Sequence, residues 1–374
     1  MNFRDFVFSW LYSSRFRGLP LVVVVLAVSL NAQTSAPLVK PVLPNPYRLD
    51  PGWPTLPAGM KGPNGRKWGE VIRVHVAPGG NIWVFQRCFN DQPNGDATCL
   101  NRGDANPPIL EFNPAGTLLR SVGAGLFAHP HGFTIDRDGN LWTTDTNDEQ
   151  TVPKIGQTVL KLNPAGAVLM TIGTPGVAGT GPDTFDRPTG VATAPNGDIF
   201  VSDGHSGNKS GSGRIVKFSS DGKFIRTWGR LGTEPGNFRD PHDLYVGGSK
   251  GYVYVADRQN NRVQVFDQDG KFIAAWKQFG QPSSVFVDRR DNLYVGSTYQ
   301  DPSTRESPAG PNNRAIVVGD AITGELRYLI PDAGDLGKMT DTGTSASGIA
   351  VDEGGTIYAA DVGFNNLRKY VRVQ

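Results

Sequence analysis

The chain of 374 residues has almost no excess of charge of either sign. Its 37 Lys and Arg residues nearly balance its 35 Asp and Glu residues, which gives a formal net charge of +2. Nucleic acids and anionic membrane surfaces attract proteins that concentrate positive charge. The composition therefore argues against a nucleic-acid partner and against binding to a membrane surface.

Long hydrophobic runs are also scarce. The apolar run at residues 19–30 follows Arg15 and Arg17. It is too short for a membrane-spanning helix, which needs about 20 residues. We therefore expect residues 1–32 to be a signal peptide and the protein to be exported, to the periplasm or the extracellular space. A retained membrane anchor is the alternative.

Cysteine is nearly absent. The two cysteines, Cys88 and Cys99, allow at most one disulfide within the chain. In an exported protein such a pair is most simply a disulfide that closes a short loop. A two-cysteine metal site is the alternative, and the lack of a histidine between them argues against it.

Glycine and proline are abundant, with 47 and 28 residues, and many of them lie in a phrase that repeats six times. Each copy is an apolar strand, an Asn-Gly or Asp-Gly turn, and a second apolar strand. Two more strands follow most copies. The copies start near Val71, His129, Arg187, Asp240, Gln281 and Ser345. Six units of four short strands predict an all-β fold, a six-bladed β-propeller with blades of four antiparallel strands, over residues 69–374.

A Pro-rich segment, residues 33–68, precedes the repeats and is expected to be extended. The last repeat ends soon after residues 367–373, apparently without a fourth strand. We expect a segment from within residues 45–75 to supply that strand and so to tie the two ends of the propeller together.

Residues at the same place in each repeat form a ring around the propeller axis. The first position of the six first strands is occupied by Ile72, His131, Thr189, His242, Ser283 and Ser347. His131 and His242 come from alternate blades, so both can reach the axis, and Ser347 is the third corner. Three protein donors with an open fourth position are typical of a catalytic zinc site. The alternative is that the two histidines anchor turns through backbone hydrogen bonds.

A second ring follows the second strands. Arg87 and Arg258 could clamp a carboxylate in bidentate fashion. His205 and Tyr299 could act as acid or base. The alternative for Arg258 is a structural role in locking adjacent blades. Four aspartates that recur at one register are expected to be structural: Asp145, Asp203, Asp257 and Asp361.

The phrases at residues 129–145, 201–204 and 255–264 resemble the peptidyl-α-hydroxyglycine α-amidating lyase family, and the general repeat resembles the NHL type. The resemblance implies a six-bladed propeller that uses zinc to convert a C-terminal α-hydroxyglycine into a peptide amide and glyoxylate. His131 and His242 match two of the family's zinc ligands. Its two active-site arginines match Arg87 and Arg258.

The chain departs from the family at three positions. The third zinc histidine is Ser347 here. The aspartate that follows it, which helps to hold a structural calcium in the family, is Gly348. The tyrosine proposed as general base is His205. A third donor to zinc could come from His205, from Tyr299 or from a carboxylate.

These residues indicate a monomeric metal-dependent lyase that acts on a small-molecule or peptide substrate with a carboxylate. A non-catalytic NHL propeller that binds a protein, a peptide or an envelope ligand is the alternative, because a missing ligand is typical of a decayed site. A lactonase-type propeller would use a calcium cage of Glu, Asn and Asp side chains. The ring positions offer His, Thr and Ser instead, which argues against it.

Overall fold

The computed structural model describes residues 43–56, 68–87, 99–100, 107–147, 154–205, 211–298, 314–331 and 346–373. Within these ranges the chain forms strands β1 to β24 and a short 3-10 helix, η3 (Arg258–Asn260). No helix in the described part of the chain is long and apolar enough to cross a membrane. The predicted signal peptide, residues 1–32, lies outside the described residues, as do Cys88 and Tyr299.

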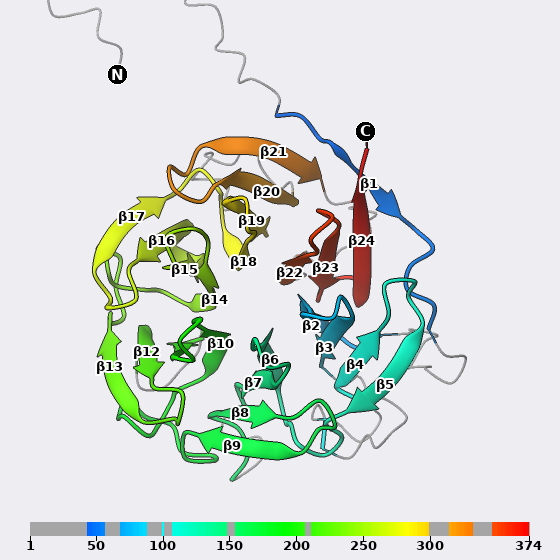
Figure 1. The fold of residues 1–374 in the computed structure, drawn as a ribbon. Coiled ribbons are helices and arrows are strands. Elements are labelled where there is room, and N and C mark those ends of the chain that lie inside the picture. Colours follow the sequence, from blue (N-terminus) through cyan, green and yellow to red (C-terminus); the bar gives the residue numbers. More distant parts are fainter. Residues whose placement is uncertain are drawn as a thin grey trace, which may run out of the picture. The chain divides into compact units, whose positions relative to one another are not determined.

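The strands form six antiparallel sheets of four strands, which surround a central axis as the blades of a propeller (Figure 1). Blade 1 contains β2 (Val71–Val76), β3 (Ile82–Gln86), β4 (Ile109–Phe112) and β5 (Leu118–Val122). Blade 2 contains β6 (Pro130–Ile135), β7 (Leu141–Asp145), β8 (Thr158–Leu162) and β9 (Val168–Ile172). Blade 3 contains β10 (Pro188–Thr193), β11 (Ile199–Asp203), β12 (Arg214–Phe218) and β13 (Phe224–Trp228). The predicted fold class is confirmed.

The other half of the ring repeats the same order. Blade 4 contains β14 (Pro241–Gly247), β15 (Tyr252–Asp257), β16 (Arg262–Phe266) and β17 (Phe272–Trp276). Blade 5 contains β18 (Pro282–Val287), β19 (Asn292–Ser297), β20 (Ala315–Asp320) and β21 (Leu326–Pro331). Blade 6 contains β22 (Gly348–Val351), β23 (Ile357–Asp361), β24 (Asn366–Arg372) and β1 (Tyr47–Asp50).

The expected closure of the ring is confirmed by β1. This strand lies within the Pro-rich segment and pairs antiparallel with β24 as the outer strand of blade 6. Tyr47 is 7% exposed, and Asp50 lies 3.5 Å from the Lys369 ammonium. The propeller therefore includes residues that precede its predicted start at 69.

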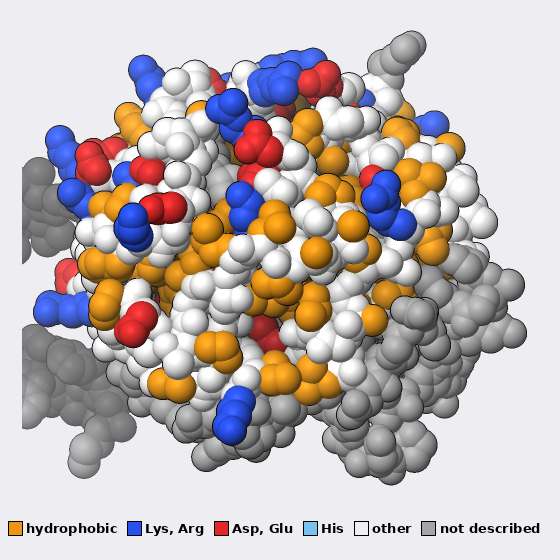
Figure 2. Space-filling view, turned by 60° about the horizontal axis from the view of Figure 1, so that its bottom comes forward, with side chains coloured by type: hydrophobic (Ala, Val, Ile, Leu, Met, Phe, Trp, Pro, Cys, Tyr) orange, Lys and Arg blue, Asp and Glu red, His pale blue; other side chains and the backbone are white. Residues whose placement is uncertain are grey.

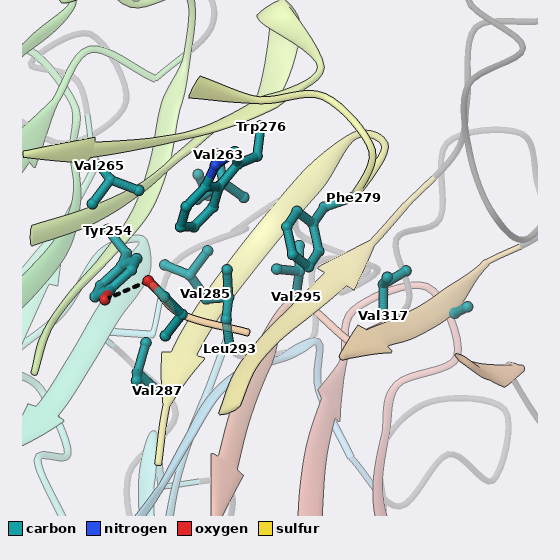
Figure 3. Close-up of a cluster of buried hydrophobic side chains, with 13 residues drawn as sticks. Tyr254, Val263, Val265, Trp276, Phe279, Val285, Val287, Leu293, Val295 and Val317 are labelled. Atoms are coloured by element: carbon teal, nitrogen blue, oxygen red, sulfur yellow. Dashed lines mark hydrogen bonds between the residues drawn. The ribbon is translucent and has the colours of Figure 1, made fainter. Parts of the chain in front are cut away.

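The second strand of each blade is buried between neighbouring blades, as its aromatic and β-branched residues predict. The aromatic residues at the matched second position after the turn in these strands are at most 3% exposed: Trp83, Trp142, Phe200, Tyr254, Tyr294 and Tyr358. In the cluster between blades 4 and 5, Val263 and Val285 pack with Tyr254 (Figure 3). The Tyr254 hydroxyl donates a hydrogen bond to the Ala321 carbonyl at 2.9 Å. The hydrophobic core thus lies mainly between blades.

The outer strands are more exposed, and some of their hydrophobic side chains reach the surface. Phe224 and Ile225 of β13 and Phe272 of β17 are 42%, 42% and 38% exposed. Figure 2 shows one face of the molecule, on which hydrophobic side chains reach the surface among charged ones. Buried polar side chains lie instead on the three inner strands of the blades, such as His131 of β6, Asp145 of β7 and Arg262 of β16.

The innermost strands share an irregularity at the predicted ring position. The pairing register shifts around His131 in β6 and around His242 in β14. Strands β2, β10 and β18 shift at the matching places. An extra residue in one strand of a pair redirects the side chain at that point. These bulges provide the physical reason why residues of matched register can face the axis.

Candidate metal centre and active site

Three histidines from consecutive blades meet at one end of the axis. His131 lies in β6, His242 lies in β14, and His205 follows β11 of the blade between them. The ring centroids are separated by 4.8 Å for His131 and His242, 5.0 Å for His131 and His205, and 5.3 Å for His205 and His242. One nitrogen from each ring lies within 4.8 Å of the others. This imidazole cluster could hold a metal ion.

Backbone carbonyls of the next blade orient two of the rings. The Nδ1 atom of His131 lies 2.6 Å from the Thr189 carbonyl, and that of His242 lies 2.8 Å from the Ser283 carbonyl. Because a carbonyl can only accept, Nδ1 carries the proton in each ring, and Nε2 of the neutral ring keeps its lone pair. Nε2 of His131 is buried without a hydrogen-bond partner among the described residues. The backbone-anchoring and metal-binding interpretations are therefore compatible.

The electrostatics of the cluster favour neutral imidazoles. Burial lowers the pKa of His131 well below the usual range, and the neighbouring His242 lowers it further. Burial likewise lowers the pKa of His242, with Arg258 as the next cause. Since a metal ion binds the neutral ring, both histidines are in the ligating form at neutral pH.

A glycine with positive φ places His205 in the cluster. Gly204 has φ of +124°, and a Cβ atom there would meet the Ser212 carbonyl oxygen at 2.2 Å. Only glycine fits this backbone conformation and this close approach. The His205 amide then donates to the Arg187 carbonyl at 3.2 Å. The chain thus turns inward immediately before the third imidazole.

The predicted third corner of the metal site, Ser347, contributes differently. Ser347 is fully buried, and its main-chain carbonyl accepts a hydrogen bond from Nη1 of Arg73. Strand β22 begins at the next residue, Gly348. The third imidazole of the cluster is His205, which was one of the candidates for a third donor.

Both predicted carboxylate-binding arginines lie near the cluster and are ion-paired. Arg87 binds Glu70 at 2.9 Å and also donates from Nε to the Pro130 carbonyl at 3.1 Å. Arg258 binds Asp240 at 2.9 Å. The arginine side chains are 17% and 19% exposed. The sequence did not point to these two carboxylate partners, because they lie in loops before the repeats' first strands.

The structural role of the recurring aspartates is confirmed. Asp145 accepts hydrogen bonds from the amides of Ala128 and His129 at 2.7 and 2.9 Å. Asp257 accepts from the Arg239 amide and binds Arg262, both at 2.8 Å. These carboxylates fasten the end of a second strand to the segment that enters the same blade.

Two other predicted residues are described only in part. Cys99 is disulfide-bonded and 2% exposed, whereas Cys88, its expected partner, lies outside the described residues. Tyr299 also lies outside them, so its predicted acid or base role stays a prediction.

Comparisons with known proteins agree with the fold and with the resemblance. The NHL repeat family matches residues 238–266. A probable peptidyl-alpha-hydroxyglycine alpha-amidating lyase of Caenorhabditis elegans is 35% identical over 202 residues, 53% of this chain and 52% of the relative. Human NHL repeat-containing protein 3 is 29% identical over 347 residues, 87% of this chain and 84% of that protein.

The coverage of longer relatives is smaller, and similarity to solved structures is confined to the fold. The match spans 21% of peptidyl-glycine alpha-amidating monooxygenase A of Xenopus laevis. A solved structure described as a putative gluconolactonase aligns with a TM-score of 0.53 at 12% identity, covering 85% of this chain and 93% of that one. At that identity only the propeller fold is shared.

The six blades and the repeat match define the class of protein: the chain is an NHL-repeat six-bladed β-propeller. Within this class its sequence is similar to peptidyl-α-hydroxyglycine α-amidating lyases of C. elegans and Drosophila melanogaster, at 35% and 31% identity. The chain spans 52% and 40% of the length of those two relatives.

Proposed function

We propose that the chain is an exported metal-dependent lyase that cleaves the C–N bond of an α-hydroxyglycine or a related hydroxyamide. The observation that supports this most strongly is the imidazole cluster of His131, His205 and His242. Arg87 and Arg258 supply positive charge near the same end of the axis. There burial is the main cause of the lowered pKa values of His131 and His242, and Arg87 lowers the first and Arg258 the second further. A site for a metal thus lies close to a site for a carboxylate.

The donor set fits zinc or a similar transition metal. Imidazole nitrogens are preferred ligands of such ions, and three of them leave a fourth position open. His131, His205 and His242 would hold the ion. When bound, it would polarise the substrate hydroxyl and ease its deprotonation.

The remaining chemistry falls to the arginines and to a base. Arg87 and Arg258 bind the substrate carboxylate, for which they must leave or share Glu70 and Asp240. The hydroxyl loses its proton and becomes the aldehyde of glyoxylate, the C–N bond breaks, and the nitrogen gains a proton to become the amide. The reaction is balanced without water or a redox partner.

A non-catalytic binding propeller is the second candidate. The ion pairs of Arg87 with Glu70 and of Arg258 with Asp240 favour it, because both arginines of the predicted carboxylate clamp already have partners. In that case the ligand would be a peptide or an envelope component that binds without turnover.

A His205→Ala variant tests the proposal. We expect it to abolish glyoxylate release from a peptidyl-α-hydroxyglycine, whereas His75→Gln, which changes a histidine outside the cluster, retains it. Metal analysis of the same variant separates two roles: loss of metal indicates a ligand, and retained metal with no turnover indicates a base. Unchanged turnover in the His205 variant would remove that residue from the mechanism.

A further inference from the structure

A single arginine joins three blades at the centre of the ring. Arg73 lies in β2 of blade 1, in an otherwise mostly apolar strand, and is 3% exposed. Its Nη2 atom donates to the His242 carbonyl at 2.9 Å, and its Nη1 atom donates to the carbonyls of Ile72 and Ser347. Blade 4 lies opposite blade 1 in the ring (Figure 1). The contact with His242 therefore links blades on opposite sides of the axis.

The surrounding groups are those that a cation needs. Three carbonyl oxygens from blades 1, 4 and 6 converge on the guanidinium, and the Asp243 carboxylate lies 3.5 Å from Nη2. Carbonyl and carboxylate oxygens are also the ligands of calcium. Without a cation, converging buried carbonyls would remain unsatisfied, which is costly.

The site does not fit the calcium ion that the family resemblance raised. Gly348 supplies no carboxylate at the position of the family's aspartate. A Cβ atom on Gly348 would meet the Arg73 Cα at 2.7 Å and the Ile72 oxygen at 2.9 Å. The guanidinium already engages the carbonyls, so the arginine and an aspartate-bound ion exclude each other at this place.

We propose that the Arg73 guanidinium is a built-in cation that replaces a bound divalent ion at the centre of the ring and positions His242 for the imidazole cluster. Its contact with His242 is through the main-chain carbonyl of that residue, whose ring belongs to the cluster. Arg73 is therefore a positioning residue. It acts on the backbone that carries a ligand.

The calcium dependence of the melting temperature tests, without any substitution, whether Arg73 replaces a divalent ion. We expect the melting temperature of the wild-type protein to be the same with calcium chloride and with a calcium chelator, and calorimetric titration with calcium to show no binding. Calcium binding together with a rise of several degrees in melting temperature would overturn the proposal.

Removal of the Arg73 charge is a second test of the built-in cation. Arg73→Met keeps chain length but loses the donors, and we expect its melting temperature to fall by about 5–10 °C. Arg73→Lys should recover part of that loss. The matched control is Arg226→Met, which removes an arginine of β13 that is 47% exposed. A wild-type melting temperature in the Met variant would contradict a built-in cation. If that variant does not fold, the Lys variant and the calcium titration still decide.

The positioning role rests on the proposed metal site and has its own readout. We expect Arg73→Lys to change the visible absorption of the cobalt(II)-loaded protein, whereas Arg226→Met leaves it unchanged. An unchanged spectrum in the Lys variant would overturn the positioning role. If the wild-type protein takes up no cobalt, the proposed function fails, while the calcium and melting experiments still judge the built-in cation.

Discussion

Blades 2, 3 and 4 differ from blades 5, 6 and 1 at the centre of the ring, although both halves share one strand pattern. The first half contributes the three imidazoles of the cluster. In the second half, the ring positions of the inner strands carry Ser283, Ser347 and Ile72. The propeller makes these positions equivalent in space, and only the side chains decide which half can bind a metal.

The second half instead contributes Arg73, a fixed positive charge. Positive charge at the centre of one ring thus comes from a side chain on one side and, in our proposal, from a metal ion on the other. In our proposal, His205 of blade 3 fills the role of the histidine that the family has in its last blade and that is Ser347 here.

The largest expected effect, on metal content and activity, comes from removing imidazoles of the first half. A His131→Ala/His242→Ala double variant should lose its bound transition metal and at least 100-fold of its activity, because ligand loss should exceed the roughly 10–100-fold effect of losing a supporting residue. His75→Gln serves as the histidine control. Metal content and glyoxylate release measure the two effects. A double variant that keeps its metal would contradict the assignment of the metal site to blades 2, 3 and 4.

Removal of the closing strand β1 from blade 6, in the second half, should give the next largest effect, a loss of stability. A chain that starts at residue 53 lacks β1, which leaves the edge of β24 unpaired and loses the buried Tyr47. We expect a melting temperature roughly 10 °C below that of a chain starting at residue 43. Calorimetry of the two truncations makes the comparison, and equal melting temperatures would show that β1 does not hold the ring closed.

A smaller effect should follow from freeing one arginine. Glu70→Gln removes the partner of Arg87 and leaves its charge available to a substrate carboxylate. Since a partly exposed ion pair contributes up to about 1 kcal/mol, KM should fall by up to about fivefold with little change in kcat. Glu325→Gln is the control at the surface. An unchanged or raised KM would argue against competition between Glu70 and substrate.

The last effect concerns the pH dependence of stability alone and involves His75 of blade 1. Burial lowers its pKa to about 4, against 6.5 in the unfolded chain. Between these values the unfolded state binds a proton that the folded state does not, so the free energy of unfolding falls as pH drops. His75→Gln should reduce this fall by about 1–2 kcal/mol.

Urea unfolding of wild type and His75→Gln between pH 7 and pH 4 measures the difference. Comparing the two proteins is necessary because Asp361, with its pKa raised by burial to about 7, acts in the opposite direction: its contribution is lost as pH rises. Identical pH profiles would show that His75 is not titrating as its burial requires.

The repeat pattern was enough to predict the fold, because strand length, turn residues and alternation are local properties. Even the closing strand could be expected, since the last repeat lacked a partner that residues 47–50 then supply. The site was predicted only in part. His131 and His242 share one register, whereas His205 reaches them from a different position, after Gly204, whose backbone conformation only glycine fits.

Other features of the site depend on contacts between distant segments, which one sequence does not reveal. Arg73 and Ser347 are hydrogen-bonded although 274 positions separate them. The signal available was a charged residue in a buried, largely apolar strand, Val71–Val76. Such a residue requires partners, but the sequence does not say which ones.

The most direct test of the central claim is elemental analysis of the purified wild-type protein after loosely bound ions are removed. The account predicts about one zinc or similar transition metal per chain, held by the three imidazoles, and no bound calcium. A folded propeller with no transition metal would contradict the metal-dependent lyase and leave the binding propeller as the better account.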